Sequence, residues 1–506
     1  MFEAAEVGRK LSKSDYKAQV PHLRSELLAV QQDLRQAGSF PAIVLFAGVD
    51  TAGKSETVNL LNEWMDPRWI MTRGYTEPSS DERERPRLWR YWRDLPPHGR
   101  IAIFLSAWYS SPILDRVAGR TSKAEFDSLL DQVAAFERTL TDDGAVIVKF
   151  WMHLSKKAQR KRLREFEKNP LQRWRVTRDQ WKHWEMFDKF VAAADRAIRR
   201  TSTEAAQWHI VEGEDERYRT VAVAAQLRDA IRRGIERRSS GKSGRPQSSA
   251  RRRAADGPVK AIRRVAREFN VLDNLDLSQN VSDDDFDKES AEKQARLSML
   301  QRRAIKRGVS TILVFEGWDA AGKGGAIRRV TGSLDARDYQ VIPIAAPTDE
   351  ERAHHYLWRF WRHLSRKGRL TIFDRSWYGR VLVERVERFA TDAEYMRAYG
   401  EINHFEEQLV NHGILVLKFW IHISKAEQLR RFNDRSRTIY KRWKITDEDW
   451  RNRKRWEDYT VAVNDMVERT STKIAPWTLV EGNDKNFARI KVLGTLAAAL
   501  GHRLNR

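Results

Sequence analysis

The chain of 506 residues contains no cysteine, which excludes a disulfide framework and any metal site built from cysteine. It also lacks an apolar run of about 18 residues, the length that a membrane-spanning helix needs, and its N-terminus lacks the apolar stretch of a signal peptide. Acidic residues are outnumbered, 70 against 93 lysines and arginines. We therefore expect a cytoplasmic protein with no membrane partner.

The basic excess is the most prominent feature of the composition. A formal net charge of +23 predicts a polyanionic partner; nucleic acid, an acidic membrane surface, nucleotides and inorganic polyphosphate would all be attracted. The 19 tryptophans are compatible with base stacking, although most tryptophans of folded proteins pack in cores and interfaces. Composition alone leaves the kind of polyanion open.

The chain consists of two copies of one domain. Gly53 and Gly322, Phe150 and Phe419, and Trp208 and Trp477 are three matching pairs, each separated by 269 positions, and a period this long indicates duplicated domains. The stretch at 239–258 is rich in Ser, Gly, Pro and Arg and has no apolar periodicity, which is typical of a flexible linker. We therefore predict domains at 1–238 and 259–506 joined by a basic linker at 239–258.

The second copy alternates short apolar runs with helical patterns, which predicts a parallel β-sheet covered by helices. Five runs are expected to be strands buried on both faces: 311–315, 340–346, 370–373, 414–421 and 477–480. A long, basic and aromatic helical segment at 424–466 precedes the last strand, where a mobile lid is expected. The fold class is thus α/β, with tandem P-loop kinase-like domains that each carry a parallel sheet, flanking helices and a helical lid.

Each copy contains a phosphate-binding loop. The first, "GVDTAGKSE" at 48–56, has the full pattern of glycines, lysine and hydroxyl, in which backbone N–H groups cradle phosphates and the hydroxyl holds a metal ion. The second, "GWDAAGKGG" at 317–325, has Gly324 in place of the hydroxyl. By this motif alone the first copy would be the enzyme.

A second phosphate-site element reverses that ranking. "LTIFDRSWYGR" at 370–380 ends a strand with Asp374, followed by Arg375 and Arg380, and a carboxylate at this place normally anchors the metal ion. The first copy has Leu105, Ser106 and Ser111 at the same positions. We predict that the second copy carries the main activity and that the first is structural or regulatory.

The conserved spacing also separates packing residues from charged ones. Trp108 and Trp377 occur in both copies, so we interpret them as packing residues. In the lid the second copy has cations where the first does not, at Arg435, Lys441, Lys454 and Arg455 against Phe166, Gln172, Glu185 and Met186.

Four ordered stretches of the second copy resemble family-2 polyphosphate kinases. They are "FEGWDAAGKGG", "DRSWYGRVLVERVE", "RWKITDEDW" and "TSTKIAPWTLVEGNDKNFARI", and the first copy carries them in degraded form. The resemblance implies transfer of a phosphoryl group from inorganic polyphosphate to a nucleotide with Mg²⁺. The tandem arrangement resembles the subgroup that converts AMP to ADP, and the family tolerates Gly after the loop lysine.

The resemblance assigns positions to the expected chemistry. The catalytic group comprises Asp319, Lys323, Asp374 and Arg375, of which Asp319 and Asp374 would hold the Mg²⁺. Phosphate and nucleotide contacts are expected from Gly317, Ala320, Ala321, Gly322, Gly324, Gly325, Arg380, Arg431, Arg435, Lys441, Arg442 and Lys444. The segment at 354–369 has arginines at helical spacing, which form either a track for the polyphosphate chain or a solvated helix face.

Three alternative functions remain open from the sequence. The first is a polyphosphate-dependent nucleoside diphosphate kinase that converts ADP to ATP, and the second is an ATP-dependent kinase of a small molecule. The third, a nucleic-acid-binding ATPase, is disfavoured because no RNA-binding signature occurs, so no nucleic acid partner is required. The sequence leaves the oligomeric state open, a homo-oligomer included.

Overall fold

The computed structural model describes residues 1–239, 270–438 and 445–505, and the chain divides into two compact units. The first unit contains most of the first sequence copy together with Asp349–His355, and the second contains most of the second copy together with Ser79–Trp89. Apart from Ser239, the predicted linker lies outside the described residues. No helix in the described ranges is long and apolar enough to cross a membrane.

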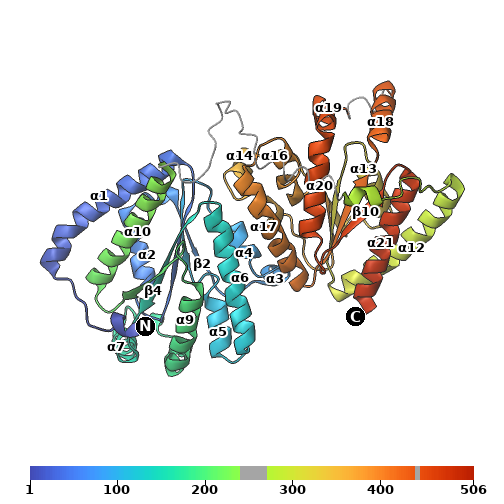
Figure 1. The fold of residues 1–506 in the computed structure, drawn as a ribbon. Coiled ribbons are helices and arrows are strands. Elements are labelled where there is room, and N and C mark those ends of the chain that lie inside the picture. The colour runs from blue at the N-terminus through green and yellow to red at the C-terminus, as the bar shows by residue number, and fades with distance from the viewer. Residues whose placement is uncertain (240–269, 439–444, 506) are drawn as a thin grey trace. The chain divides into compact units, whose positions relative to one another are not determined.

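The first unit is built around a five-stranded parallel sheet with strand order β2-β3-β1-β4-β5. Its strands are β1 (Ala42–Gly48), β2 (Ile70–Gly74), β3 (Ile101–Leu105), β4 (Val146–His153) and β5 (Trp208–Glu212). Its main helices are α1 (Lys13–Ala37), α2 (Lys54–Trp64), α5 (Ser110–Val117), α6 (Lys123–Asp142), α7 (Lys156–Lys168), α8 (Arg178–Glu185), α9 (Phe187–Thr201) and α10 (Glu216–Ser239). In Figure 1, α1, α2 and α10 cover one face of this sheet and α6 and α9 the other.

The second unit repeats this topology with strand order β10-β9-β6-β8-β7, again wholly parallel. Its strands are β6 (Thr311–Gly317), β7 (Tyr339–Pro343), β8 (Leu370–Asp374), β9 (Leu415–His422) and β10 (Trp477–Glu481). Its main helices are α12 (Asp283–Arg307), α13 (Lys323–Thr331), α17 (Asp392–Asn411), α18 (Lys425–Arg437), α19 (Asp447–Lys454), α20 (Trp456–Thr470) and α21 (Lys485–Asn505). The predicted fold class is confirmed, and β6, central in the order, carries the phosphate-binding loop at its carboxyl end.

The prediction that all five strands are buried on both faces is wrong for β7. This strand lies at the edge of the sheet, where only one neighbour covers it, and most of its residues are at least partly exposed. Val341 is 36% exposed, whereas Leu313 in the central strand is fully buried. The apolar sequence of 340–346 therefore does not distinguish an edge strand from a central one.

Both units contain the same buried polar network behind the sheet. The Lys418 ammonium donates to Glu406 at 2.7 Å and to the backbone oxygen of Thr470 at 2.7 Å, and the Trp377 indole N–H donates to Glu406 at 3.0 Å. Lys149 contacts Glu137 at the same 2.7 Å in the first unit. Trp108 and Trp377 are both fully buried, so their interpretation as packing residues is confirmed.

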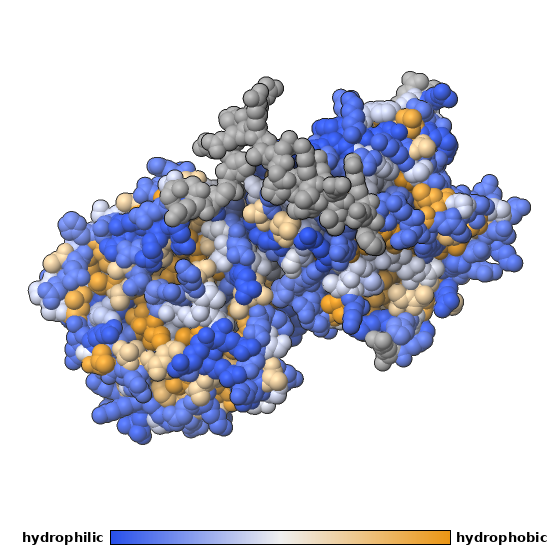
Figure 2. Space-filling view, viewed as in Figure 1, coloured by the Kyte–Doolittle hydropathy of each residue, from blue (hydrophilic) through white to orange (hydrophobic). Residues whose placement is uncertain are grey.

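The molecular surface reflects the composition. Figure 2 shows a face on which hydrophilic residues predominate and hydrophobic ones are scattered among them. Such a surface is compatible with a chain whose Lys and Arg exceed its Asp and Glu by 23.

Candidate active site

The phosphate-binding loop of the second unit connects β6 to α13 and depends on two glycines. Gly317 has a φ of 149°, and a Cβ at this position would lie 2.5 Å from the backbone oxygen of Ile421, so no larger residue fits against β9. Gly322 has a φ of 114° and caps the N-terminus of α13, whose first N–H groups point to where an anion would bind. A Cβ on Gly324 would meet nothing within 4 Å.

Lys323 begins α13 and folds back over the loop. Its ammonium donates to the backbone oxygens of Gly317 at 2.7 Å and Trp318 at 3.3 Å. Burial lowers the pKa of Lys323, and the nearby charge of Asp319 opposes this shift. A bound phosphate would provide the negative charge that this buried cation otherwise obtains only in part.

Asp319 and Arg375 join the loop to the end of β8. Arg375 follows Asp374, the last residue of the strand, and adopts a φ of 65°, which is unusual for a residue with a side chain. Its guanidinium lies 3.2 Å from one oxygen of Asp319, while the amide of Asn452 in α19 donates to the other oxygen at 2.9 Å. The lid helix is therefore tied directly to the phosphate-binding loop.

Trp318 anchors the loop from a different direction. Its indole N–H donates to the Nδ1 atom of His422 at 3.0 Å, and its ring stacks on Trp456 with centroids 3.7 Å apart. Trp456 is the first residue of α20, directly after the lid helix α19. The base of the lid and the phosphate-binding loop are thus packed together.

A cavity of about 470 Å³ opens over these elements. Its lining has seven basic and two acidic side chains, so it suits a polyanion. The basic residues are Lys323, Arg328, Arg375, Arg431, Arg435, Lys485 and Arg489, and the acidic ones are Asp374 and Asp434.

Many residues predicted from the sequence line this cavity. Ten of them meet there: Ala320, Ala321, Gly322, Lys323, Gly324, Gly325, Asp374, Arg375, Arg431 and Arg435. Gly317 and Asp319 lie within the loop but do not line the cavity. Arg380 does not line it either, and its guanidinium forms an ion pair with Glu384 at 3.2 Å. The predicted residues Lys441, Arg442 and Lys444 lie outside the described residues.

Arg431 serves the shape of the loop as well as its charge. Its guanidinium donates to the backbone oxygens of Ala321 at 2.8 Å and Gly482 at 2.6 Å, and the residue is only 3% exposed. These bonds connect the phosphate-binding loop to the turn after β10. The sequence predicts that Arg431 contacts phosphate, but most of its N–H groups donate to backbone oxygens of the protein.

Sequence reasoning missed several residues of the site. Lys485 and Arg489 lie one helical turn apart at the start of α21, a spacing that could have identified them. Glu316, directly before the loop, is buried and accepts a hydrogen bond from Ser376 at 2.8 Å. Burial raises the pKa of Glu316 although this hydrogen bond opposes the shift. The contact of Asn452 with Asp319 could not be predicted, because no motif around Asn452 indicates that its side chain approaches the phosphate-binding loop.

The arginines at helical spacing in 354–369 were expected to share one basic helix face, and the structure does not have such a face. The structure has only a short helix, α15 (Trp358–Trp361), and the chain then turns to enter β8. Arg359 donates to the backbone oxygen of Ala345 at 3.1 Å, and Arg366 forms an ion pair with Glu84 at 2.7 Å. These arginines therefore do not form the single basic helix face that the spacing suggested.

The first unit keeps the loop but not its charged surroundings. Lys54 donates to two loop backbone oxygens at 2.8 Å, as Lys323 does, and Asp50 is held by His183 at 2.8 Å. The cations that line the second cavity at Arg328, Arg375, Arg435, Lys485 and Arg489 are replaced by Asn59, Ser106, Phe166, Glu216 and Thr220. The loop conformation is thus maintained where five of the seven basic residues that line the second cavity are replaced by uncharged or acidic ones.

Comparisons with known proteins agree with the duplication. The family model of polyphosphate kinase 2 matches residues 10–238 and again 280–505. A curated protein of Pseudomonas aeruginosa named polyphosphate:AMP phosphotransferase is 50% identical over 500 residues, which cover 99% of this chain and 98% of the relative. A shorter relative of Mycobacterium tuberculosis, named GDP-polyphosphate phosphotransferase, is 38% identical over 224 residues, or 44% of this chain and 76% of the relative.

A solved structure has the same architecture over its whole length. A polyphosphate kinase 2 structure from Pseudomonas aeruginosa superimposes with a TM-score of 0.88 at 49% identity, and the match covers 100% of both chains. The two-domain arrangement is therefore shared with a protein whose structure is known.

Proposed function

The chain belongs to the polyphosphate kinase 2 family, and we propose that its second domain transfers the terminal phosphoryl group of inorganic polyphosphate to AMP, which gives ADP. The observation that carries this proposal is the cavity of about 470 Å³, in which a phosphate-binding loop meets seven basic side chains. The AMP acceptor is supported by the Pseudomonas aeruginosa relative, which is named polyphosphate:AMP phosphotransferase and of which the match covers 98%.

The lining suits a linear polyanion better than a single small phosphate. Lys485 and Arg489 enter from α21, Arg435 from α18 and Arg328 from α13, so positive charge surrounds the loop on several elements. Because polyphosphate carries a charge on every unit, several cations can act on one chain at once. Its affinity should therefore fall steeply with salt, as binding to a phosphate backbone does.

A magnesium ion would be held by Asp319 and Asp374. Carboxylate oxygens are the ligands that Mg²⁺ prefers, and it commonly takes one or two carboxylates together with substrate phosphates. Asp319 belongs to the phosphate-binding loop, and Asp374 ends β8 and lines the cavity beside it. When bound, Mg²⁺ supplies positive charge to the oxygens of the transferred phosphoryl group.

The protein's own residues position and stabilise the reacting groups. An oxygen of the AMP phosphate attacks the terminal phosphorus of polyphosphate, the bond to the bridging oxygen breaks, and the shortened chain keeps the electron pair. Lys323 and Arg375 are placed to stabilise the charge on the transferred group. The AMP phosphate is largely ionised near neutral pH, so a strong general base is unnecessary.

The lid helices would close over the bound substrates. Arg435 on α18 lines the cavity, and Asn452 on α19 already contacts Asp319 at 2.9 Å. Closure would exclude water and so prevent loss of the phosphoryl group to hydrolysis. The first domain, which lacks the equivalents of Asp374 and Arg375, would have a structural or regulatory role.

The test uses purified full-length protein with Mg²⁺, polyphosphate and no ATP. We expect ADP to form from AMP, and initial rates with AMP, ADP, GMP and GDP should be highest with AMP. A higher rate with ADP or GDP would favour the diphosphate activity named for the shorter relative. No product without added ATP would refute the proposal. Competition by RNA at equal phosphate concentration should have little effect on the rate.

A further inference from the structure

The second domain contains a buried ion pair beside its phosphate-binding loop. The Arg431 Nε atom donates to a carboxylate oxygen of Glu427 at 2.6 Å, and both residues belong to α18. The other nitrogens of Arg431 donate to backbone oxygens of the loop and of the turn after β10. The carboxylate therefore compensates the charge of a guanidinium that is almost wholly removed from water.

The first domain keeps the arginine but not the carboxylate. Arg162 occupies the place of Arg431 and makes the same backbone contacts, to Thr51 at 2.9 Å and Glu214 at 2.7 Å. The position of Glu427 is Ala158. In the part of the chain that the structure describes, no carboxylate is hydrogen-bonded to Arg162 and its Nε atom makes no hydrogen bond, although the charges of nearby glutamates act on the guanidinium.

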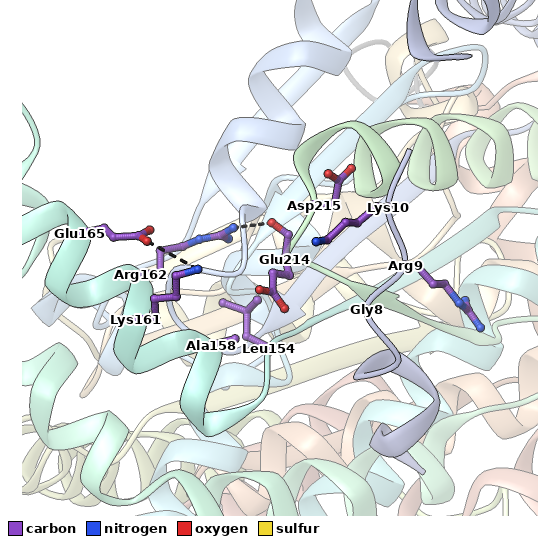
Figure 3. A pocket seen from close by; sticks show the side chains of 10 residues that line it. All are labelled: Gly8, Arg9, Lys10, Leu154, Ala158, Lys161, Arg162, Glu165, Glu214 and Asp215. Atoms are coloured by element: carbon purple, nitrogen blue, oxygen red, sulfur yellow. Dashed lines mark hydrogen bonds and ion pairs between the residues drawn. The ribbon is translucent and has the colours of Figure 1, made fainter. Parts of the chain in front are cut away.

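A cavity of about 250 Å³ lies where that carboxylate would be. Figure 3 shows Arg162 reaching the backbone of Glu214 across the cavity, with Ala158 and Leu154 at its floor. Lys161 faces Glu165, but at 4.0 Å and with both side chains largely exposed this ion pair is weak. The cavity is smaller than the pockets that usually hold nucleotides, so it suits an anion of a few atoms.

A second arginine, Arg219, lies beside the phosphate-binding loop of the first domain but does not line this cavity. Arg219, which replaces Ala488 of the second domain, is only 4% exposed and lies directly against Gly53. One of its nitrogens donates to the backbone oxygen of Gly213 at 3.1 Å, but its Nε atom is buried without a partner. Burial lowers the pKa of Arg219, and the neighbouring charge of Arg162 lowers it further. The first domain has thus gained a buried cation at Arg219 and lost the carboxylate of Glu427. It has also gained carboxylates at Glu56, Glu214 and Glu216, which replace Gly325, Asn483 and Lys485.

Three carboxylates line the cavity, those of Glu165, Glu214 and Asp215, and in Figure 3 the Glu214 side chain lies among the lining residues. Asp215 accepts the backbone N–H groups of Tyr218 at 2.7 Å and Leu11 at 3.4 Å, as a cap of α10. Glu165 is opposite Lys161, and the Lys10 side chain enters from the N-terminal segment. The lining has four basic and three acidic residues, a balance that leaves room for one negative charge.

We propose that this cavity binds a small oxyanion, a carboxylate or phosphate group, which accepts a hydrogen bond from the Arg162 Nε atom in the place that the Glu427 carboxylate occupies in the second domain. The site is separate from the phosphoryl-transfer site and does not depend on the proposed function. Its two sources of ligand, a carboxylate metabolite or inorganic phosphate, share the chemistry that a guanidinium recognises.

The test compares the full-length protein with an Ala158→Glu variant, which restores the carboxylate in place. Isothermal titration and thermal unfolding would be measured with phosphate and with acetate, against chloride at equal ionic strength. An Ala18→Glu variant, changed on an exposed turn of α1, adds the same charge away from the cavity and is the matched control. Binding at the phosphate-binding loop of the second domain is common to all three proteins and cancels in the comparison.

We expect at least one of the two anions to bind the natural protein and the Ala18→Glu control at one more site than it binds Ala158→Glu. The same anion should raise the unfolding midpoint of the natural protein and the control by more than it raises that of Ala158→Glu. Phosphate without acetate would identify a phosphate site, and both together a general oxyanion site. Equal stoichiometry in all three proteins would overturn the proposal. If Ala158→Glu fails to fold, crystals of the natural protein grown with selenate decide: anomalous density beside Arg162 supports the site, and its absence refutes it.

Discussion

Replacing Lys323 by methionine tests which domain transfers the phosphoryl group. Methionine keeps the length of the side chain but removes the ammonium, and with it the bonds to Gly317 and Trp318 at 2.7 and 3.3 Å. The same replacement of Lys54 removes two equivalent bonds at 2.8 Å, so the two variants lose a similar local contribution to folding. They differ only in the surroundings of the lysine.

The expected effect on catalysis follows from those surroundings. Loss of one preorganised donor at a developing charge typically lowers kcat by about 10² to 10³, equivalent to about 2.7–4 kcal/mol. Lys323 lies in a cavity with six other basic side chains, but it alone begins α13 and contacts the backbone of the phosphate-binding loop through its ammonium, so we expect the upper part of this range. Lys54→Met should reduce kcat less than twofold.

The assay measures ADP formed from AMP and polyphosphate under saturating Mg²⁺, with thermal unfolding of both variants in parallel. Similar unfolding midpoints would show that the variants are matched in stability. The reasoning would be refuted if Lys54→Met abolished turnover while Lys323→Met retained it. Equal losses in both variants would also contradict a catalytic role confined to the second domain.

Three further predictions concern the network, the metal ion and pH. Glu406→Gln leaves the buried Lys418 ammonium without its carboxylate and should lower the free energy of unfolding by about 3–5 kcal/mol, measured by urea denaturation; no measurable change would contradict the structural role. Asp374→Leu, which reproduces the residue of the first domain, should lower turnover at least about 10²-fold, and chelation with EDTA should abolish the activity of the natural protein; turnover insensitive to EDTA would exclude the proposed metal ion. Burial lowers the pKa of His422 to about 4, below its unfolded value near 6.5, so its contribution is complete above pH 6.5 and is lost as the pH falls toward 4, by about 3 kcal/mol in total. His422→Gln should flatten the dependence of unfolding free energy on pH across that interval, and an unchanged slope would show that other groups determine it.

The presence of the parallel strands was predictable, because buried parallel strands are short runs of apolar residues. The runs at 311–315 and 414–421 correspond to β6 and β9, and their apolar residues fill the interior as expected. The constant separation of 269 positions extended the strands predicted in the second copy to the first. Local composition, however, does not specify how many neighbours a strand has, which is why β7 is more exposed than predicted.

The part of the site that lies near the loop in sequence was also predictable. Asp374 ends β8 and Lys323 follows the loop after β6, and carboxyl ends of parallel strands meet at one edge of the sheet. Asn452 could not be placed in this way, because its approach to the loop depends on how α19 packs, and the one-turn spacing of Lys485 and Arg489 indicates a shared helix face but not that this face lines the cavity. Long-range helix packing has no counterpart in the spacing of residues along the chain.

The empty space beside Gly324 bears on how such enzymes are recognised. A Cβ there would meet nothing within 4 Å, so the loop could accommodate serine and its glycine is not imposed by crowding. A genome search that requires a hydroxyl after the lysine would therefore select the first domain and pass over the second. In this chain, such a search would select the copy for which we propose a structural or regulatory role.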